Sequence, residues 1–227
     1  SVPLGRFLPF SLLFSLNSIM ASVMAAKMGA GKSVYGLAVE TSTVLETTNK
    51  SIDCLEKLLK ACTELKKEMG LTLADHFEKA ATTAGAYGKS MSNAEAGGVY
   101  TNIQARFSGV GAARRQYATL LEANQIKSLT AFKEDIKGAR AAMKALDAAR
   151  KGVAVAKAKS KGKEDNPELA AANEAANAEA TNVEKSTVAA LTAFNQKAGQ
   201  LTIEMSDKLV AMEKELNAAV KVALCPA

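Results

Sequence analysis

The chain has 227 residues, which suits one domain or one long helical module. It contains 48% hydrophobic residues but no Trp and only 5% aromatics, so it lacks the bulky side chains of most compact cores and is typical of a coiled coil. An odd number of cysteines, three in all, argues against a secreted disulfide scaffold and favours a reducing compartment.

The net charge of +6 is distributed unevenly along the chain. Residues 34–125 carry ten basic and ten acidic side chains, residues 126–163 carry eleven basic and three acidic, and residues 164–220 carry four basic and ten acidic. Segregated charge of this size creates an electric field over one part of the surface. It predicts an anionic partner for residues 126–163, either a membrane surface or a nucleic acid.

The N-terminal segment, residues 1–33, is treated as an extension that precedes the main domain. Residues 7–26 carry no charge and begin with a dense apolar cluster after Arg6. Such a segment suits an upstream extension or targeting remnant, a membrane-inserting segment, or a transmembrane anchor. The polar residues Ser11, Ser15 and Asn17 weaken the transmembrane interpretation.

The main domain, residues 34–222, is predicted to be almost entirely helical. No proline lies between Pro9 and Pro167 or between Pro167 and Pro226, and proline breaks helix interiors at a cost of roughly 3 kcal/mol. Apolar residues at intervals of three and four predict a first long helix over 34–66, and no strand pattern is visible. Gly70 is expected to allow a kink or brief break in this helix.

Two further boundaries are predicted between the first and second helices. Thr72 with Asp75 resembles a capping pair that restarts the helix after Gly70. The glycines at 85 and 88 are expected to soften the end of that helix, and residues 93–98 are predicted to form the turn. Thr101 followed by Gln104 is a candidate capping box for the second helix.

The second helix is predicted to continue to about Ala158 and to end in a lysine-rich tip over 159–166. Asn166 can cap a third helix, Pro167 fits its first position, and Glu168 complements the helix dipole. The third helix is predicted to run to about Val222, which leaves residues 223–227 as a short tail.

Basic residues follow the second helix in a stripe that lies one position beyond its apolar seam. Because one residue turns about 100° around a helix axis, this stripe should stay exposed beside the buried seam. It continues into a cluster at the tip. The candidate membrane-binding residues are Lys133, Lys137, Arg140, Lys144, Arg150, Lys151, Lys157, Lys159, Lys161 and Lys163.

The stretch over 129–163 resembles the second helix and tip of BAR domains, especially of the amphiphysin and endophilin type. The matching residues are the D-I-K triplet that begins at Asp135, the D-x-A-R segment from Asp147 to Arg150, and the lysine-rich tip. The aromatic residue that often precedes D-x-A-R in that family is replaced here by Ala145 and Leu146. The three-helix plan of the resemblance covers about 34–222.

The resemblance implies an all-α fold: a long kinked antiparallel three-helix coiled coil that forms a crescent-shaped six-helix-bundle homodimer. It also implies binding of curved anionic membranes through the concave face and tips, and a cytoplasmic, peripheral role in processes such as endocytosis. Members of the N-terminal-helix subtype insert an amphipathic helix into the bilayer. The similar residues here are Met20, Val23, Met24, Lys27, Met28 and Lys32.

The sequence therefore predicts a protein that senses or generates membrane curvature. Two alternatives stay open: a coiled-coil scaffold or small-GTPase-binding adaptor without membrane affinity, and a nucleic-acid-binding coiled coil. The basic region contains only one aromatic, Phe132, and no zinc or helix-turn-helix signature, so a nucleic-acid partner is not expected.

No catalytic constellation is visible, and neither enzymatic activity nor a cofactor is expected. His76 is the only histidine, which leaves no histidine-based metal site or acid–base pair. The segment from Gly29 to Ser33 evokes a phosphate-binding loop, but Ala26 stands where that pattern requires glycine and no strand precedes it.

Overall fold

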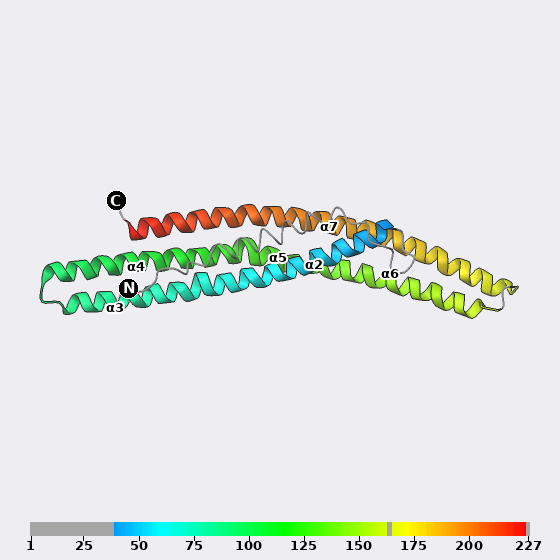
Figure 1. Cartoon of the computed structure of the whole chain (residues 1–227), viewed down its shortest axis with the longest axis horizontal. Helices are drawn as coiled ribbons and strands as arrows, with labels where there is room; N and C mark the ends of the chain where they lie inside the picture. The colour runs from blue at the N-terminus through cyan, green and yellow to red at the C-terminus, as the bar shows by residue number, and fades with distance from the viewer. Residues whose placement is uncertain (1–38, 163–164, 226–227) are drawn as a thin grey trace. The chain divides into compact units, whose positions relative to one another are not determined.

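The computed structural model describes residues 39–162 and 165–225, and all of its regular structure is helical (Figure 1). The elements are α2 (Val39–Leu65), the π-helical turn η1 (Lys66–Thr72), α3 (Leu73–Ser90), α4 (Ala94–Leu121), the π-helical turn η2 (Glu122–Ile126), α5 (Lys127–Ala131), α6 (Lys133–Ser160) and α7 (Pro167–Leu224). The predicted all-α class with three long helical segments is confirmed. The predictions for residues 1–33 lie outside the described residues.

The chain divides into two compact units, which are described separately. The tip unit comprises residues 39–55 and 132–200, and it contains α6 with the N-terminal part of α7. The hairpin unit comprises residues 56–131 and 201–225, and it contains α3, α4 and the C-terminal part of α7.

The turn between α3 and α4 lies earlier than the sequence predicts. The Asn93 side chain accepts hydrogen bonds from the backbone N–H groups of Glu95 at 2.9 Å and Ala96 at 3.2 Å, so α4 begins at Ala94. The predicted turn over 93–98 and the predicted capping box at Thr101 are therefore wrong. Residues 94–98, which include two glycines, already belong to the start of α4. An asparagine just before a helix accepts hydrogen bonds from the free backbone N–H groups of the first turn. Glycine has no side chain that could accept them.

The glycines of the hairpin unit allow close helix packing rather than softening helix ends. A Cβ atom at Gly85 would lie 2.3 Å from Gln104 Oε1, and one at Gly88 would lie 2.9 Å from Tyr100 Cβ. Both glycines lie within α3, which continues to Ser90, so the prediction that they weaken its end is wrong. Because glycine has no side chain, α3 and α4 can approach each other closely. The two helices lie side by side and run in opposite directions (Figure 1).

The helix does not break at Gly70, and Thr72 does not restart it. The wider π-helical turn η1 connects α2 to α3 without leaving helical geometry, and the Thr72 side chain makes no capping hydrogen bond. Lys66, the first residue of η1, donates to Glu122, the first residue of η2, over 2.9 Å. The expected brief break and the capping pair are therefore wrong, because the helix widens here without ending, whereas the alternative of a kink at Gly70 stays a prediction.

Replacing Gly70 with alanine is expected to lower the free energy of unfolding by about 1–3 kcal/mol. The new Cβ would lie 2.6 Å from Ala118 Cβ and 3.2 Å from Ala118 Cα, so the backbone itself would have to move. Gly152→Ala, where a Cβ meets nothing within 4 Å, is the matched control and should gain about 0.4–1 kcal/mol. Chemical denaturation of both variants measures the difference, and equal stabilities would contradict the packing described.

The core of the hairpin unit forms where α4 faces the C-terminal part of α7. Tyr117 and Leu121 are 2% and 0% exposed, and they cluster with Ala113, Met212 and Leu216. The Tyr117 hydroxyl donates a hydrogen bond to Glu213, and burial together with that carboxylate raises the pKa of Tyr117. The tyrosine therefore stays neutral, and its hydroxyl has a hydrogen-bond partner in the half-buried Glu213.

Cys62 in this unit is expected to resist alkylation. It is 3% exposed, and burial raises the pKa of its thiol to about 11. Because only the thiolate reacts, iodoacetamide at pH 8 should modify Cys62 at least about 100-fold more slowly than the exposed Cys225. Peptide mass spectrometry after timed labelling gives both rates, with the denatured chain as the control; similar rates in the folded protein would contradict this burial.

In the tip unit, α6 runs beside the N-terminal part of α7 (Figure 1). The rings of Phe132 and Phe194 lie 5.5 Å apart, and Leu146 and Leu191 are buried nearly completely. The predicted boundary at the tip is confirmed. Asn166 accepts hydrogen bonds from the backbone N–H groups of Glu168 at 3.0 Å and Leu169 at 3.3 Å, and α7 begins at Pro167.

Candidate membrane-binding surface

The basic residues of α6 lie beside its buried seam, as the one-residue offset predicts. Ile136 and Ala139 are buried at 5% exposure each, whereas the stripe residues next to them are exposed. The exposed stripe residues are Lys133, Lys137, Arg140, Lys144 and Lys151. A helix that buries one side against α7 therefore presents a row of cations on another.

Local carboxylates neutralise part of this row. Lys137 pairs with Glu134 at 2.6 Å, and Lys151 pairs with Asp147 at 2.7 Å. The hydrogen bond from Lys151 to Asp147 raises the pKa of the lysine, so its charge persists at every physiological pH. Exposed pairs of this kind exchange readily with water and with competing anions.

The tip lysines, defined as Lys157, Lys159 and Lys161, differ from the paired Lys137 and Lys151. All three are exposed, and none forms an ion pair with any residue that the structure describes. They follow one another at every second residue at the end of α6, where cations complement the negative end of the helix dipole. Lys163 lies outside the described residues.

Arg150 has a structural environment unlike that of the other basic residues. Its side chain is only 25% exposed, and its Nη2 pairs with Glu184 Oε2 at 3.2 Å. Glu184 also accepts a hydrogen bond from Thr41 Oγ1 at 2.7 Å, so the arginine helps to join α6, α7 and α2 within the tip unit. We therefore leave Arg150 out of the candidate surface.

Within the tip unit, α6 and α7 carry opposite charge. Within Lys133–Ser160, α6 has eight basic and three acidic residues, whereas residues 167–200 of α7 have two basic and four acidic residues. Glu168, Glu174 and Glu179 on α7 are exposed and form no ion pair with any residue that the structure describes. An anionic partner should therefore meet α6 rather than α7.

Sequence reasoning missed a polar contact at the tip. Asn173 Nδ2 on α7 donates to Ser160 Oγ at the end of α6 over 2.6 Å. The two residues lie thirteen positions apart on either side of the turn, and neither belongs to a sequence motif. The contact can be recognised only once the pairing of α6 with α7 is known.

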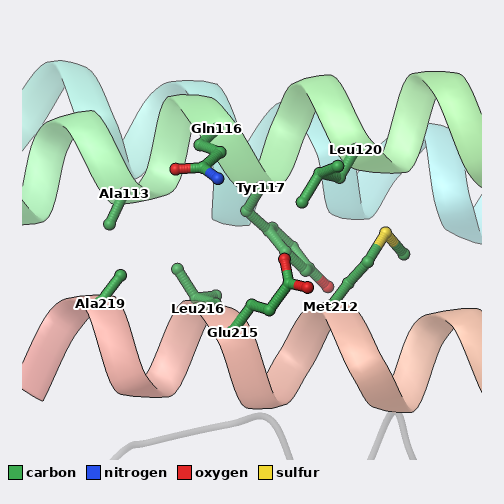
Figure 2. Close-up of a pocket in the computed structure, with 8 residues that line it drawn as sticks. All are labelled: Ala113, Gln116, Tyr117, Leu120, Met212, Glu215, Leu216 and Ala219. Carbon is green, nitrogen blue, oxygen red and sulfur yellow. The ribbon is translucent and has the colours of Figure 1, made fainter.

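Hollows lie between helices in both units: a small gap between α4 and α7, and a wider, open hollow of about 460 Å³ between α6 and α7 that is lined by Glu134, Asp135, Lys197 and other side chains. The gap between α4 and α7 in Figure 2 has a volume of about 30 Å³ and is lined by Tyr117, Leu120, Met212 and other side chains. That volume holds about one water molecule. Across residues 39–162 and 165–225, no group of three or more metal-ligating side chains gathers.

No helix among the described residues combines the length and apolar character needed to cross a membrane. Comparisons with protein-family models, with curated proteins and with solved structures find no match to the chain.

Proposed function

We propose that this protein attaches peripherally to anionic membranes through the tip lysines and the exposed basic stripe of α6. The observation that carries the proposal is the set of three exposed tip lysines without ion-pair partners in the described chain. A basic residue near an anionic bilayer contributes about 1 kcal/mol of binding free energy. Lys133 and Lys144, which are also exposed and unpaired among the described residues, extend the attractive surface along the helix.

A membrane fits this surface better than a single-stranded nucleic acid does. Proteins that bind single-stranded nucleic acids stack bases on exposed aromatic rings. The one aromatic residue of the basic region, Phe132, is 9% exposed and packs against Phe194. A flat array of lipid headgroups requires only exposed cations, which the helix provides.

We further propose that the protein acts as a homodimer that senses or generates curvature, in line with its resemblance to BAR domains. Support for a dimer comes from α7 in the hairpin unit, where Ile203 and Val210 are 52% and 43% exposed. A spacing of seven residues places both side chains on one side of the helix, which favours an apolar contact with a second copy. Sedimentation of Ile203→Glu/Val210→Glu tests this: we expect a dimer for the wild type and a monomer for the variant.

The membrane proposal is tested by binding to phosphatidylserine-rich vesicles over a series of salt concentrations, with short duplex DNA as a parallel ligand. Binding to vesicles should weaken steadily with salt, because screening shortens the reach of exposed charges. Stronger binding to 50 nm than to 400 nm vesicles would support curvature sensing. Retention of DNA at physiological salt without vesicle binding would instead support the nucleic-acid alternative.

A further inference from the structure

Ser160 occupies a chemically unusual position at the end of the basic surface. It is the last residue of α6, and it is flanked by Lys157 three positions before it, Lys159 immediately before it and Lys161 immediately after it. No other serine of the chain has three basic residues between positions −3 and +1. Its side chain is half-buried, and the residue that follows it in the sequence is no longer helical.

Two hydrogen bonds hold the Ser160 hydroxyl between the helices of the tip unit. Its Oγ donates to the backbone carbonyl of Lys157 at 3.1 Å and accepts from Asn173 Nδ2 at 2.6 Å. The other amide atom of Asn173, Oδ1, is buried and has no hydrogen-bond partner among the described residues. The Ser160 hydroxyl thus links α6 to α7. A larger anionic group on this oxygen would disturb both hydrogen bonds.

We propose that Ser160 is a phosphorylation site for a serine/threonine protein kinase that selects basic substrates, and that phosphorylation releases the tip from the membrane. The release half of this inference rests on the proposed function. In the reaction, Ser160 Oγ bonds to the γ-phosphorus of ATP and the bond to the β-phosphate oxygen breaks. ADP leaves, and the hydroxyl proton passes to a base of the kinase.

The local backbone suits such a reaction. The last carbonyl groups of a helix have no partners within the helix, so its final residue separates from the helix more easily than an interior residue. Directly after Ser160, Lys161 leaves helical geometry with a ψ of 121°, and Gly162 follows with a φ of 75° in the left-handed region. The flanking lysines provide positive charge that an acidic substrate groove would select.

The phosphate would act directly on the tip lysines. It adds a charge of about −1.5 to −2 beside three cations and at the negative end of the helix dipole. Because each basic residue near an anionic surface strengthens binding roughly fivefold, cancelling about two of them should weaken binding about 25-fold. The esterified oxygen also loses the proton that it donates to Lys157, which loosens the end of α6.

The test combines the whole chain, a basophilic kinase with ATP, and vesicles rich in phosphatidylserine. Peptide mass spectrometry should place the phosphate on Ser160, and the phosphorylated chain should bind vesicles about 25-fold more weakly. Ser160→Glu should weaken binding in the same direction, whereas Ser160→Ala, which removes the hydrogen bonds without adding charge, should bind like the wild type.

Ser186→Glu is the matched control, because Ser186 is an exposed serine of the same unit whose hydroxyl also bonds a carbonyl three residues earlier, that of Val183 at 3.0 Å. It should leave vesicle binding unchanged. Equal weakening by Ser160→Glu and Ser186→Glu, no weakening by Ser160→Glu, or no phosphate on Ser160 would each overturn the inference alone. Absence of vesicle binding by the unmodified wild type would overturn the proposed function together with the release step.

Discussion

Reversing the charge of all three tip lysines, in Lys157→Glu/Lys159→Glu/Lys161→Glu, is expected to weaken binding to phosphatidylserine-rich vesicles at least about 100-fold. The three cations are exposed and form no ion pair in the described chain, so the variant loses three attractive charges and gains three repulsive ones. Quantitative vesicle co-sedimentation at constant salt measures the change. The helices should stay folded, since none of the three side chains is buried.

A control variant separates the location of the charge from its amount. Lys79→Glu/Lys89→Glu/Lys208→Glu changes the net charge equally, and its three lysines are exposed in the hairpin unit without an ion pair among the described residues. It should bind vesicles within about threefold of the wild type, because only charges close to the lipid surface count strongly. Equal losses in the two triple variants would show that net charge alone governs binding, against the proposed surface.

Leu121→Ala is expected to have the largest effect on stability, lowering the free energy of unfolding by about 3–5 kcal/mol. Leu121 is 0% exposed and packs with Tyr117, Met212 and Leu216. Its truncation to alanine therefore leaves a cavity between these side chains. A loss of this size is a large part of the 5–15 kcal/mol typical of a folded domain. Chemical denaturation followed by circular dichroism gives the value.

Leu71→Ala makes the same chemical change in the same unit, at a residue that is 37% exposed. It should cost no more than about 1 kcal/mol, since little apolar surface returns to water. Similar losses at Leu71 and Leu121 would contradict the placement of the core between α4 and α7.

The sequence predicts the helices and the tip well because both depend on local chemistry. Avoidance of proline and the apolar spacing require no knowledge of neighbouring elements. Asn166 and Pro167 act on N–H groups within three residues, so the start of α7 follows directly from them. The exposure of the basic stripe likewise follows from helix geometry once the apolar seam is recognised.

The errors occur where a residue serves a partner that lies far away in the chain. Gly85 and Gly88 look like helix-ending signals, yet they make room for Gln104 and Tyr100 on the next helix. The sequence does not reveal Asn93 as the cap of α4, because Gly97 and Gly98 are stronger indicators of a loop and place Asn93 at the edge of a predicted turn. The π-helical turn at Gly70 has no sequence signature that separates it from a break.

The candidate surface shows the same division between local and distant effects. In the sequence, Arg150 is indistinguishable from its basic neighbours, and only the position of Glu184, thirty-four residues later, reveals its ion pair. The contact between Ser160 and Asn173 depends in the same way on how α6 and α7 are paired. Positions with long-range partners therefore needed the structure, whereas the tip lysines did not.

The most direct test of the central claim is equilibrium binding of the whole chain to phosphatidylserine-rich vesicles and to neutral phosphatidylcholine vesicles, both at about 0.15 M salt, where exposed charges act over roughly 8 Å. The proposed function predicts saturable binding to the anionic vesicles and little or none to the neutral ones. Equal binding to both compositions, or binding to neither, would contradict attachment through the basic surface of α6.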